Sequence, residues 1–214
     1  MIKLQKFIFN PFTENTYLVW DEISKESIII DPGCFSDSEK KRLADFISSN
    51  DLSIKSMILT HAHIDHILGC NYIKKNYSAE FYIPEGELPL LNHAEKQAEM
   101  FDLSIETPPL PDHLLNEKLE LGIGDYKLIF LSTPGHTPDE YCIYFEKEKI
   151  CFTGDVLFQN SIGRTDLWGG NYNQLMDSIK NKLMSLSDDI KIYPGHGNES
   201  TIGFERLNNT FLNN

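Results

Sequence analysis

The chain has 214 residues, a hydrophobic content of 41% and 32 acidic against 19 basic residues, which gives a formal net charge of −13. This length and composition are typical of an ordinary globular protein, and we expect a single domain over 1–214. The acidic balance would repel a polyanion at long range, so it argues against nucleic acid as a partner. The apolar runs are far shorter than the roughly 18 residues of a membrane span. No secretory signal is recognisable, so we expect a cytoplasmic protein that makes no membrane contact.

The chain contains four cysteines, and none of them has the spacing of a metal-binding or redox pair. They are Cys34, Cys70, Cys142 and Cys151. We expect small, buried, apolar side chains in a reducing compartment.

The first eighty residues predict strands alternating with helices. Residues 35–50 should form a helix capped at Asp37 or Ser38, because an acidic first turn precedes apolar residues at helical spacing. The strands are expected at 3–10, 16–21, 27–31, 53–60 and 79–84, and a second helix at 67–77.

A helical excursion begins near residue 86 and is not required by the strand pattern. Its helix is expected to run to about residue 104, and the proline-rich link TPPLPDH follows at 107–113. The whole segment, 86–118, could serve as a lid.

Strand signals return after the link and end in one further helix and strand. The strands are expected at 125–132, 140–148, 149–155 and 189–197, with the helix at 171–186. The order of the elements indicates α/β (α+β) architecture, with sheets covered by helices.

The stretch THAHIDHILG, at 60–69, places three of the seven histidines of the chain within six positions. His61 and His63 are two residues apart, so on an extended segment both rings point to one side and can share a metal ion. Asp65 and His66 lie where the backbone turns into a helix, and they would face a second metal position.

Three further candidate ligands follow apolar strands beside glycine-containing turns. His136 lies in TPGHT, Asp155 in TGD and His196 in PGHG. Like the histidine cluster, each is placed at the C-terminal end of its strand, so the seven residues should converge. His93 and His113 fall outside this pattern, and we expect structural roles for both.

The series HxHxDH, PGHT, GD and PGHG resembles the metallo-β-lactamase superfamily along the whole chain. The resemblance implies a four-layer αββα sandwich of two mixed sheets. It also implies that one metal ion is bound by His61, His63 and His136, and the other by Asp65, His66 and His196. Asp155 would bridge the two ions, and Asp31, in IIIDPG, would orient a ligand histidine from behind.

Within this superfamily the sequence looks like the short glyoxalase II type, as indicated by SIGRTDLWGG at 161–170 and by the segment that follows PGHG. The implied activity is hydrolysis of acyl thioesters such as S-lactoylglutathione by a metal-bridging hydroxide, which Asp65 would help to orient. The helical domain that glyoxalase II adds at its C-terminus is not expected after His196, so the thiol carrier stays open.

Two alternative functions remain open at this point. Persulfide dioxygenases, which use one iron ion and consume oxygen, share HxHxDH, PGHT, GD and the GRTD motif. A non-catalytic metal-binding scaffold is the third hypothesis, although seven candidate ligands exceed the four of a closed structural site. Two divalent ions are expected, zinc first, with iron or manganese also suited to these ligands. The sequence does not indicate an oligomeric state.

Arg164 is the candidate substrate-binding residue, because a guanidinium near the metal ions would hold a carboxylate of the thiol carrier. An ion pair with Asp166 that fixes the GRTD turn is an equally weighted alternative. Trp168 would wall the pocket or pack elsewhere on the protein.

Overall fold

The computed structural model describes residues 1–213, and these divide into two compact units. Unit 1 contains 1–115 and 122–126, and unit 2 contains 116–121 and the described residues from 127 onward. The expectation of one domain over the whole chain stays a prediction.

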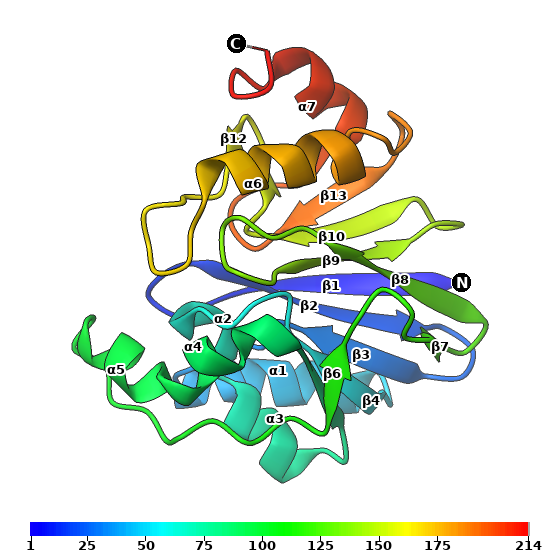
Figure 1. Ribbon diagram of the computed structural model, residues 1–214. Helices are drawn as coiled ribbons and strands as arrows, with labels where there is room; N and C mark the ends of the chain where they lie inside the picture. The colour runs from blue at the N-terminus through cyan, green and yellow to red at the C-terminus, as the bar shows by residue number, and fades with distance from the viewer. Residues whose placement is uncertain (214) are drawn as a thin grey trace. The chain divides into compact units, whose positions relative to one another are not determined.

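Unit 1 is built on a six-stranded mixed sheet in the order β1-β2-β3-β4-β5-β6 (Figure 1). The first three strands pair antiparallel, whereas β3, β4, β5 and β6 run parallel to one another. Parallel neighbours require a crossover between them, and helices lie in all three crossovers. The strands are β1 (Ile2–Phe9), β2 (Glu14–Asp21), β3 (Glu26–Ile30), β4 (Ser53–Ile58), β5 (Glu80–Pro84) and β6 (His113–Leu115).

Helices α1 and α3 pack on one face of this sheet (Figure 1). The capping residue of α1 is Ser36, not the expected Asp37 or Ser38, because the Ser36 hydroxyl accepts the Glu39 N–H while the Glu39 carboxylate accepts the Ser36 N–H. The helices of unit 1 are α1 (Asp37–Ser49), α2 (Ile64–Ile67), α3 (Cys70–Asn76), the 3₁₀ turn η1 (Glu85–Glu87), α4 (Leu88–Asn92) and α5 (Ala94–Glu99).

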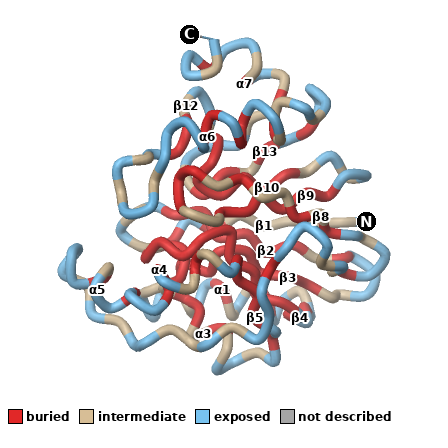
Figure 2. The backbone as a smooth tube through the Cα atoms, in the orientation of Figure 1, coloured by how far each residue is buried: buried red, intermediate tan, exposed pale blue. Residues whose placement is uncertain are grey.

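The core of unit 1 lies between the sheet and these helices. Leu43 of α1 and Ile73 of α3 are fully buried against strand residues such as Ile29, Met57 and Phe81. Figure 2 shows the buried backbone along the central strands and the exposed turn that follows α5. Burial of the apolar face of each element is the main source of its stability.

Unit 2 contains a second mixed sheet, in the order β14-β13-β10-β9-β8-β7, and a small hairpin of β11 and β12. Strands β10 and β13 are parallel, and β8, β9 and β10 pair antiparallel in succession. Strand β7 and the first residue of β8 fall at the boundary of the units. The strands are β7 (Leu121–Ile123), β8 (Tyr126–Ser132), β9 (Tyr141–Phe145), β10 (Ile150–Gly154), β11 (Leu157–Phe158), β12 (Ser161–Ile162), β13 (Lys191–Pro194) and β14 (Ser200–Thr201).

The helices of unit 2 bury Leu175, Ile179 and Ile202 against the residues of its sheet. Asn171 caps the first of them, because its side chain accepts the Gln174 N–H. These helices are α6 (Tyr172–Ser178), its π-helical continuation η2 (Ile179–Leu183) and α7 (Ile202–Asn208).

All the longer strands expected from the sequence are present, but two helical predictions were wrong in detail. The helix expected at 67–77 is broken at Gly69, whose N–H donates to the Pro32 carbonyl at 2.6 Å instead of to a carbonyl of its own helix. The helical excursion ends at Glu99 rather than near 104, and part of the expected link forms β6.

Two further expectations concern burial and membranes. All four cysteines are buried and have free thiols, as predicted. Among residues 1–213, no helix combines the length and apolar character needed to cross a bilayer.

Candidate metal centre

The first set of predicted site residues follows two parallel strands of unit 1. Asp31 follows β3 directly, and the cluster from His61 to His66 begins three residues after β4. Because β3 and β4 are parallel neighbours, their C-terminal ends meet at one edge of the sheet. The ligand atoms of Asp31, His61 and His66 accordingly lie within 4.8 Å of one another.

Asp31 supports His61 through hydrogen bonds with Thr60. Its carboxylate accepts the Thr60 N–H at 2.7 Å and the Thr60 hydroxyl at 2.6 Å. Since the single hydroxyl proton points to Asp31, the Thr60 oxygen is left to accept the Nδ1–H of His61, 3.0 Å away. This arrangement places the proton of neutral His61 on Nδ1, so Nε2 carries no proton, as a metal ligand requires.

The same aspartate also contacts the last histidine of the cluster. His66 Nδ1 lies 3.1 Å from Asp31 Oδ2, and His66 Nε2 lies 3.6 Å from Asp65 Oδ2. The main-chain carbonyl of Asp65 accepts a 2.9 Å hydrogen bond from the Asn10 side chain, which fixes the turn. His63 directly precedes α2 in an extended conformation, and its ring meets that of His61 edge to face at 4.9 Å.

The second set of predicted residues gathers at one edge of the unit 2 sheet. Asp155 and His196 follow the parallel strands β10 and β13, and His136 follows β8, which runs in the same direction as β10. Asp155 Oδ2 lies 3.7 Å from His136 Nε2 and 3.6 Å from His196 Nε2. One carboxylate oxygen therefore lies next to both imidazoles, as a bridging ligand requires.

Main-chain and buried groups hold these three side chains in place. The Arg164 carbonyl accepts the Nδ1–H of His136 at 2.7 Å, so Nε2 of the neutral ring carries no proton, as a metal ligand requires. The fully buried Glu140 accepts the Asp155 N–H at 2.7 Å. Gly163 lies so close to this turn that a Cβ would be 1.9 Å from the Asp155 carbonyl oxygen.

The donor sets fit divalent metal ions of intermediate hardness, since they combine imidazole nitrogens with carboxylate oxygens. Two donor atoms bound at about 2.1 Å to one tetrahedral ion lie about 3.4 Å apart. The imidazole–carboxylate separations of 3.6 and 3.7 Å are close to this value and longer than hydrogen bonds. Each unit thus supplies a partial ligand set in suitable geometry. The assignment of individual ligands stays a prediction.

Arg164 has a partner within its own turn. Its Nε and Nη2 atoms donate to the two Asp166 oxygens at 2.7 Å each. The guanidinium lowers the pKa of Asp166 to about 2, and the pKa of Arg164 is raised in return. This geometry is the one expected if the Arg164–Asp166 ion pair fixes the GRTD turn. A substrate-binding role for Arg164 stays a prediction. Trp168 is 62% exposed, so it does not pack in the core.

The two histidines outside the pattern have local partners. His113 Nε2 lies 2.9 Å from a Glu80 oxygen, and its ring stacks on Tyr82. His93 Nδ1 lies 2.7 Å from the Pro89 carbonyl oxygen, which caps the turn between α4 and α5.

Three buried residues that support the site were not singled out from the sequence. They are Thr60, Glu140 and Glu87, whose carboxylate accepts the Ala62 N–H at 3.0 Å. Thr60 and Glu140 lie inside or beside the recognised motifs, so their position was the available signal. Glu87 has no such signal, because an isolated glutamate after a strand is usually exposed.

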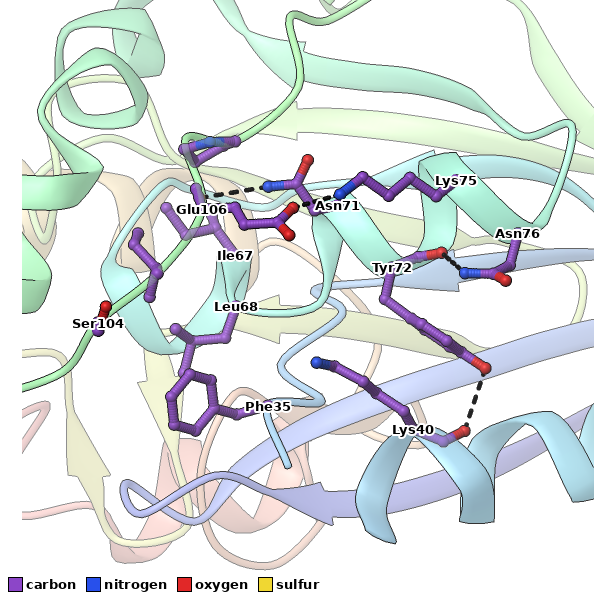
Figure 3. A pocket seen from close by; sticks show the side chains of 12 residues that line it. Phe35, Lys40, Ile67, Leu68, Asn71, Tyr72, Lys75, Asn76, Ser104 and Glu106 are labelled. Carbon is purple, nitrogen blue, oxygen red and sulfur yellow. Dashed lines mark hydrogen bonds and ion pairs between the residues drawn. The ribbon is translucent and has the colours of Figure 1, made fainter. Parts of the chain in front are cut away.

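A cavity of about 290 Å³ opens on unit 1 and contains none of the seven predicted ligands (Figure 3). Its walls include Phe35, Leu68 and Tyr72, and Lys75 forms an ion pair with Glu106 at its rim. Figure 3 also shows the Tyr72 hydroxyl reaching the Lys40 carbonyl.

The comparisons with known proteins assign the family. The metallo-beta-lactamase superfamily model matches residues 9–196. The chain therefore belongs to the metallo-β-lactamase superfamily, a family of metallo-hydrolases, and the predicted fold class is confirmed.

The chain is also similar to particular proteins of known sequence or structure. The chain is 40% identical to a Haemophilus influenzae protein named hydroxyacylglutathione hydrolase GloC, over 94% of each chain. It is similar to the crystal structure of BLEG-1 B3 metallo-beta-lactamase, with a TM-score of 0.90 and 34% identity over 99% of this chain and 100% of that one. It is also similar to TTHA1623 in a di-iron-bound form, with a TM-score of 0.85 and 32% identity over 97% and 100% of the chains.

Proposed function

We propose that this protein hydrolyses acyl thioesters of small thiols, such as S-lactoylglutathione, with two divalent metal ions. The observation that carries the proposal is the 40% identity with a hydroxyacylglutathione hydrolase over 94% of both chains. The donor sets at the two sheet edges support it, because both contain the histidines and aspartates that the HxHxDH, PGHT, GD and PGHG motifs predict.

The proposed ligand sets are those that the family resemblance implies. His61, His63 and His136 would hold one ion, Asp65, His66 and His196 would hold the other, and Asp155 would contact both. Bound ions of this kind supply a hydroxide at neutral pH and polarise an acyl carbonyl. Zinc is the first candidate, and iron is a second because a similar protein was solved in a di-iron-bound form.

The residues of the chain would prepare this chemistry in two ways. Thr60 and the Arg164 carbonyl set the tautomers of His61 and His136, so that Nε2 of each ring can coordinate. Asp65, as a ligand, would help to orient the nucleophile rather than act as a free base. No side chain is needed as a strong acid, because a thiolate with a free-thiol pKa of about 8.5 is a good leaving group.

The test is thiol release from S-lactoylglutathione by the purified protein, before and after removal of metals with a chelator. We expect rapid release that chelation abolishes and added zinc or iron restores. Asp155→Ala should abolish release, whereas Asp189→Ala, which removes an exposed carboxylate of unit 2, should not.

Three parallel substrates make the test specific. Coenzyme A thioesters test whether another thiol carrier is accepted. A chromogenic β-lactam tests for β-lactamase activity, which the name of one structural relative indicates. Glutathione persulfide, with an oxygen electrode, tests for persulfide oxidation. Oxygen consumption without thiol release from a metal-loaded sample would refute the proposal in favour of the dioxygenase. Cleavage of the β-lactam alone would refute it in favour of a lactamase.

A further inference from the structure

The main chain of Ala62, between His61 and His63, is held on both sides by side chains from the helical excursion. The Glu87 carboxylate accepts the Ala62 N–H at 3.0 Å. The Gln97 amide donates to the Ala62 carbonyl at 3.1 Å, and also to the Leu90 carbonyl at 2.9 Å. Both polar groups of this one residue are therefore bonded to side chains.

These two bonds fix two different peptide planes. The Ala62 N–H belongs to the peptide that joins it to His61, and its carbonyl belongs to the peptide that joins it to His63. Because each peptide is a rigid plane, rotation of either one would swing one imidazole relative to the other. Glu87 therefore fixes the plane next to His61, and Gln97 fixes the plane next to His63.

Burial makes these contacts hard to replace. Ala62 and Glu87 are both fully buried, so water cannot readily substitute for a lost partner of the amide. Glu87 reaches this position because it follows β5, the parallel neighbour of β4, and so lies at the same sheet edge as His61.

The helices that carry the two side chains are anchored in the core. Leu91 of α4 and Ala94 and Ala98 of α5 belong to the core of unit 1. An opening of the whole excursion as a lid would break the contacts of Glu87 and Gln97 with Ala62. The structure thus connects this segment to the geometry of the histidine pair.

We propose that Glu87 and Gln97 are positioning residues that set the spacing of His61 and His63 for metal binding. This inference rests on the metal centre of the proposed function, but not on its substrate. Loss of either contact should weaken the metal position that contains these two histidines more than the other position.

The test is competitive titration of the protein, stripped of metal, with zinc against a chromophoric chelator. We expect Glu87→Ala and Gln97→Ala to weaken one of the two bound equivalents about 10- to 100-fold, the usual effect of removing a group that orients a ligand. Glu87→Gln keeps an acceptor oxygen for the Ala62 N–H, so it should bind metal like the wild type. The visible spectrum of the cobalt-loaded alanine variants should change, whereas that of Glu87→Gln should not.

The matched control is Asp112→Ala. Asp112 also accepts a main-chain N–H in unit 1, that of Phe81 at 2.7 Å, but away from the predicted ligands. It should leave both zinc affinities and the cobalt spectrum unchanged. Circular dichroism and thermal melting without metal establish that each variant is folded, and Gln97→Ala, at a half-buried position, keeps the test decisive if Glu87→Ala does not fold.

The outcomes separate this inference from the proposed function. Folded alanine variants with wild-type zinc affinities and cobalt spectra would overturn it, as would an equal loss in Glu87→Gln. A wild type that binds two ions but cleaves no thioester would refute the proposed substrate and leave the titration valid. A wild type that binds no metal would refute both.

Discussion

Replacement of Asp31 by asparagine tests the support of the histidine cluster. Asp31 has a φ of 48°, a left-handed conformation that asparagine tolerates better than most residues. Asn therefore preserves the backbone better than Ala would, and the substitution reports on the side-chain contacts. Those contacts are the two bonds from Thr60 and the approach of His66.

The magnitude follows from the loss of one acceptor. The carboxylate accepts both Thr60 donors with its two oxygens, whereas the amide has one oxygen and turns an NH₂ group toward a donor. A buried hydrogen bond to a charged group contributes about 1.5–3 kcal/mol, so the free energy of unfolding should fall by about that amount. Zinc affinity should also fall about 10- to 100-fold, because His61 and His66 lose their orienting partner.

Urea unfolding in the presence of a chelator measures the stability effect without metal, and zinc titration measures the second effect. With a urea dependence of about 2 kcal/mol per molar, the midpoint should fall by roughly 1 M. Asp37→Asn, in the exposed first turn of α1, is the control. An unchanged midpoint together with unchanged zinc affinity in Asp31→Asn would refute the assigned role of Asp31.

Three further predictions concern other parts of the chain. Asp155→Ala should lose the normal occupancy of both metal ions and nearly all activity, as measured by metal analysis and turnover; substantial activity with one tightly bound ion would contradict a two-metal mechanism. Gly135→Ala should lower the melting temperature more than Gly197→Ala. Both glycines have positive φ, but only at Gly135 would a Cβ lie 2.2 Å from the backbone nitrogen of Leu175. Equal shifts in melting temperature would show that this clash is relieved. Burial raises the pKa of Cys34 to about 12, from 9.0 in an unfolded chain, so at pH 8 only about one such thiol in ten thousand is ionised and the native protein should react slowly with Ellman's reagent. The same shift implies a stability that is complete below pH 9 and falls as pH rises from 9 toward 12, because only the unfolded chain releases the proton in that range. Rapid reaction of a native thiol, or stability that rises over that range, would contradict the assigned burial.

The sequence predicted those features that depend on residues close together in the chain. Short apolar runs between turn-prone stretches predicted the longer strands. HxHxDH predicted close histidines, because a strand end directs alternate side chains to one side. The gathering of Asp31 with His61, and of Asp155 with His196, depends on which strands are parallel neighbours. The strand-end rule anticipated the placement of these residues, but the pairing itself is a tertiary property.

Boundaries and short elements were less predictable. The cap of α1 is Ser36 because its reciprocal bonds with Glu39 outweigh the equally suitable Asp37 and Ser38 next to it. The break between α2 and α3 arises from the close approach of Gly69 to Pro32, two residues far apart in the sequence. Strand β6 exists because it adds to the edge of β5, a partner that its own three residues do not reveal.

By itself the sequence determined the chemical types of the candidate ligands, their order along the chain and the strand ends that carry them. Only the tertiary structure decided which groups form hydrogen bonds that support these ligands. They are Thr60 between Asp31 and His61, the Arg164 carbonyl bonded to His136, and Glu87 bonded to Ala62. The physical reason is that a metal-binding motif is read from neighbours in the sequence. The hydrogen bonds that fix a tautomer or a peptide plane come from whichever distant segment folding buries against that motif.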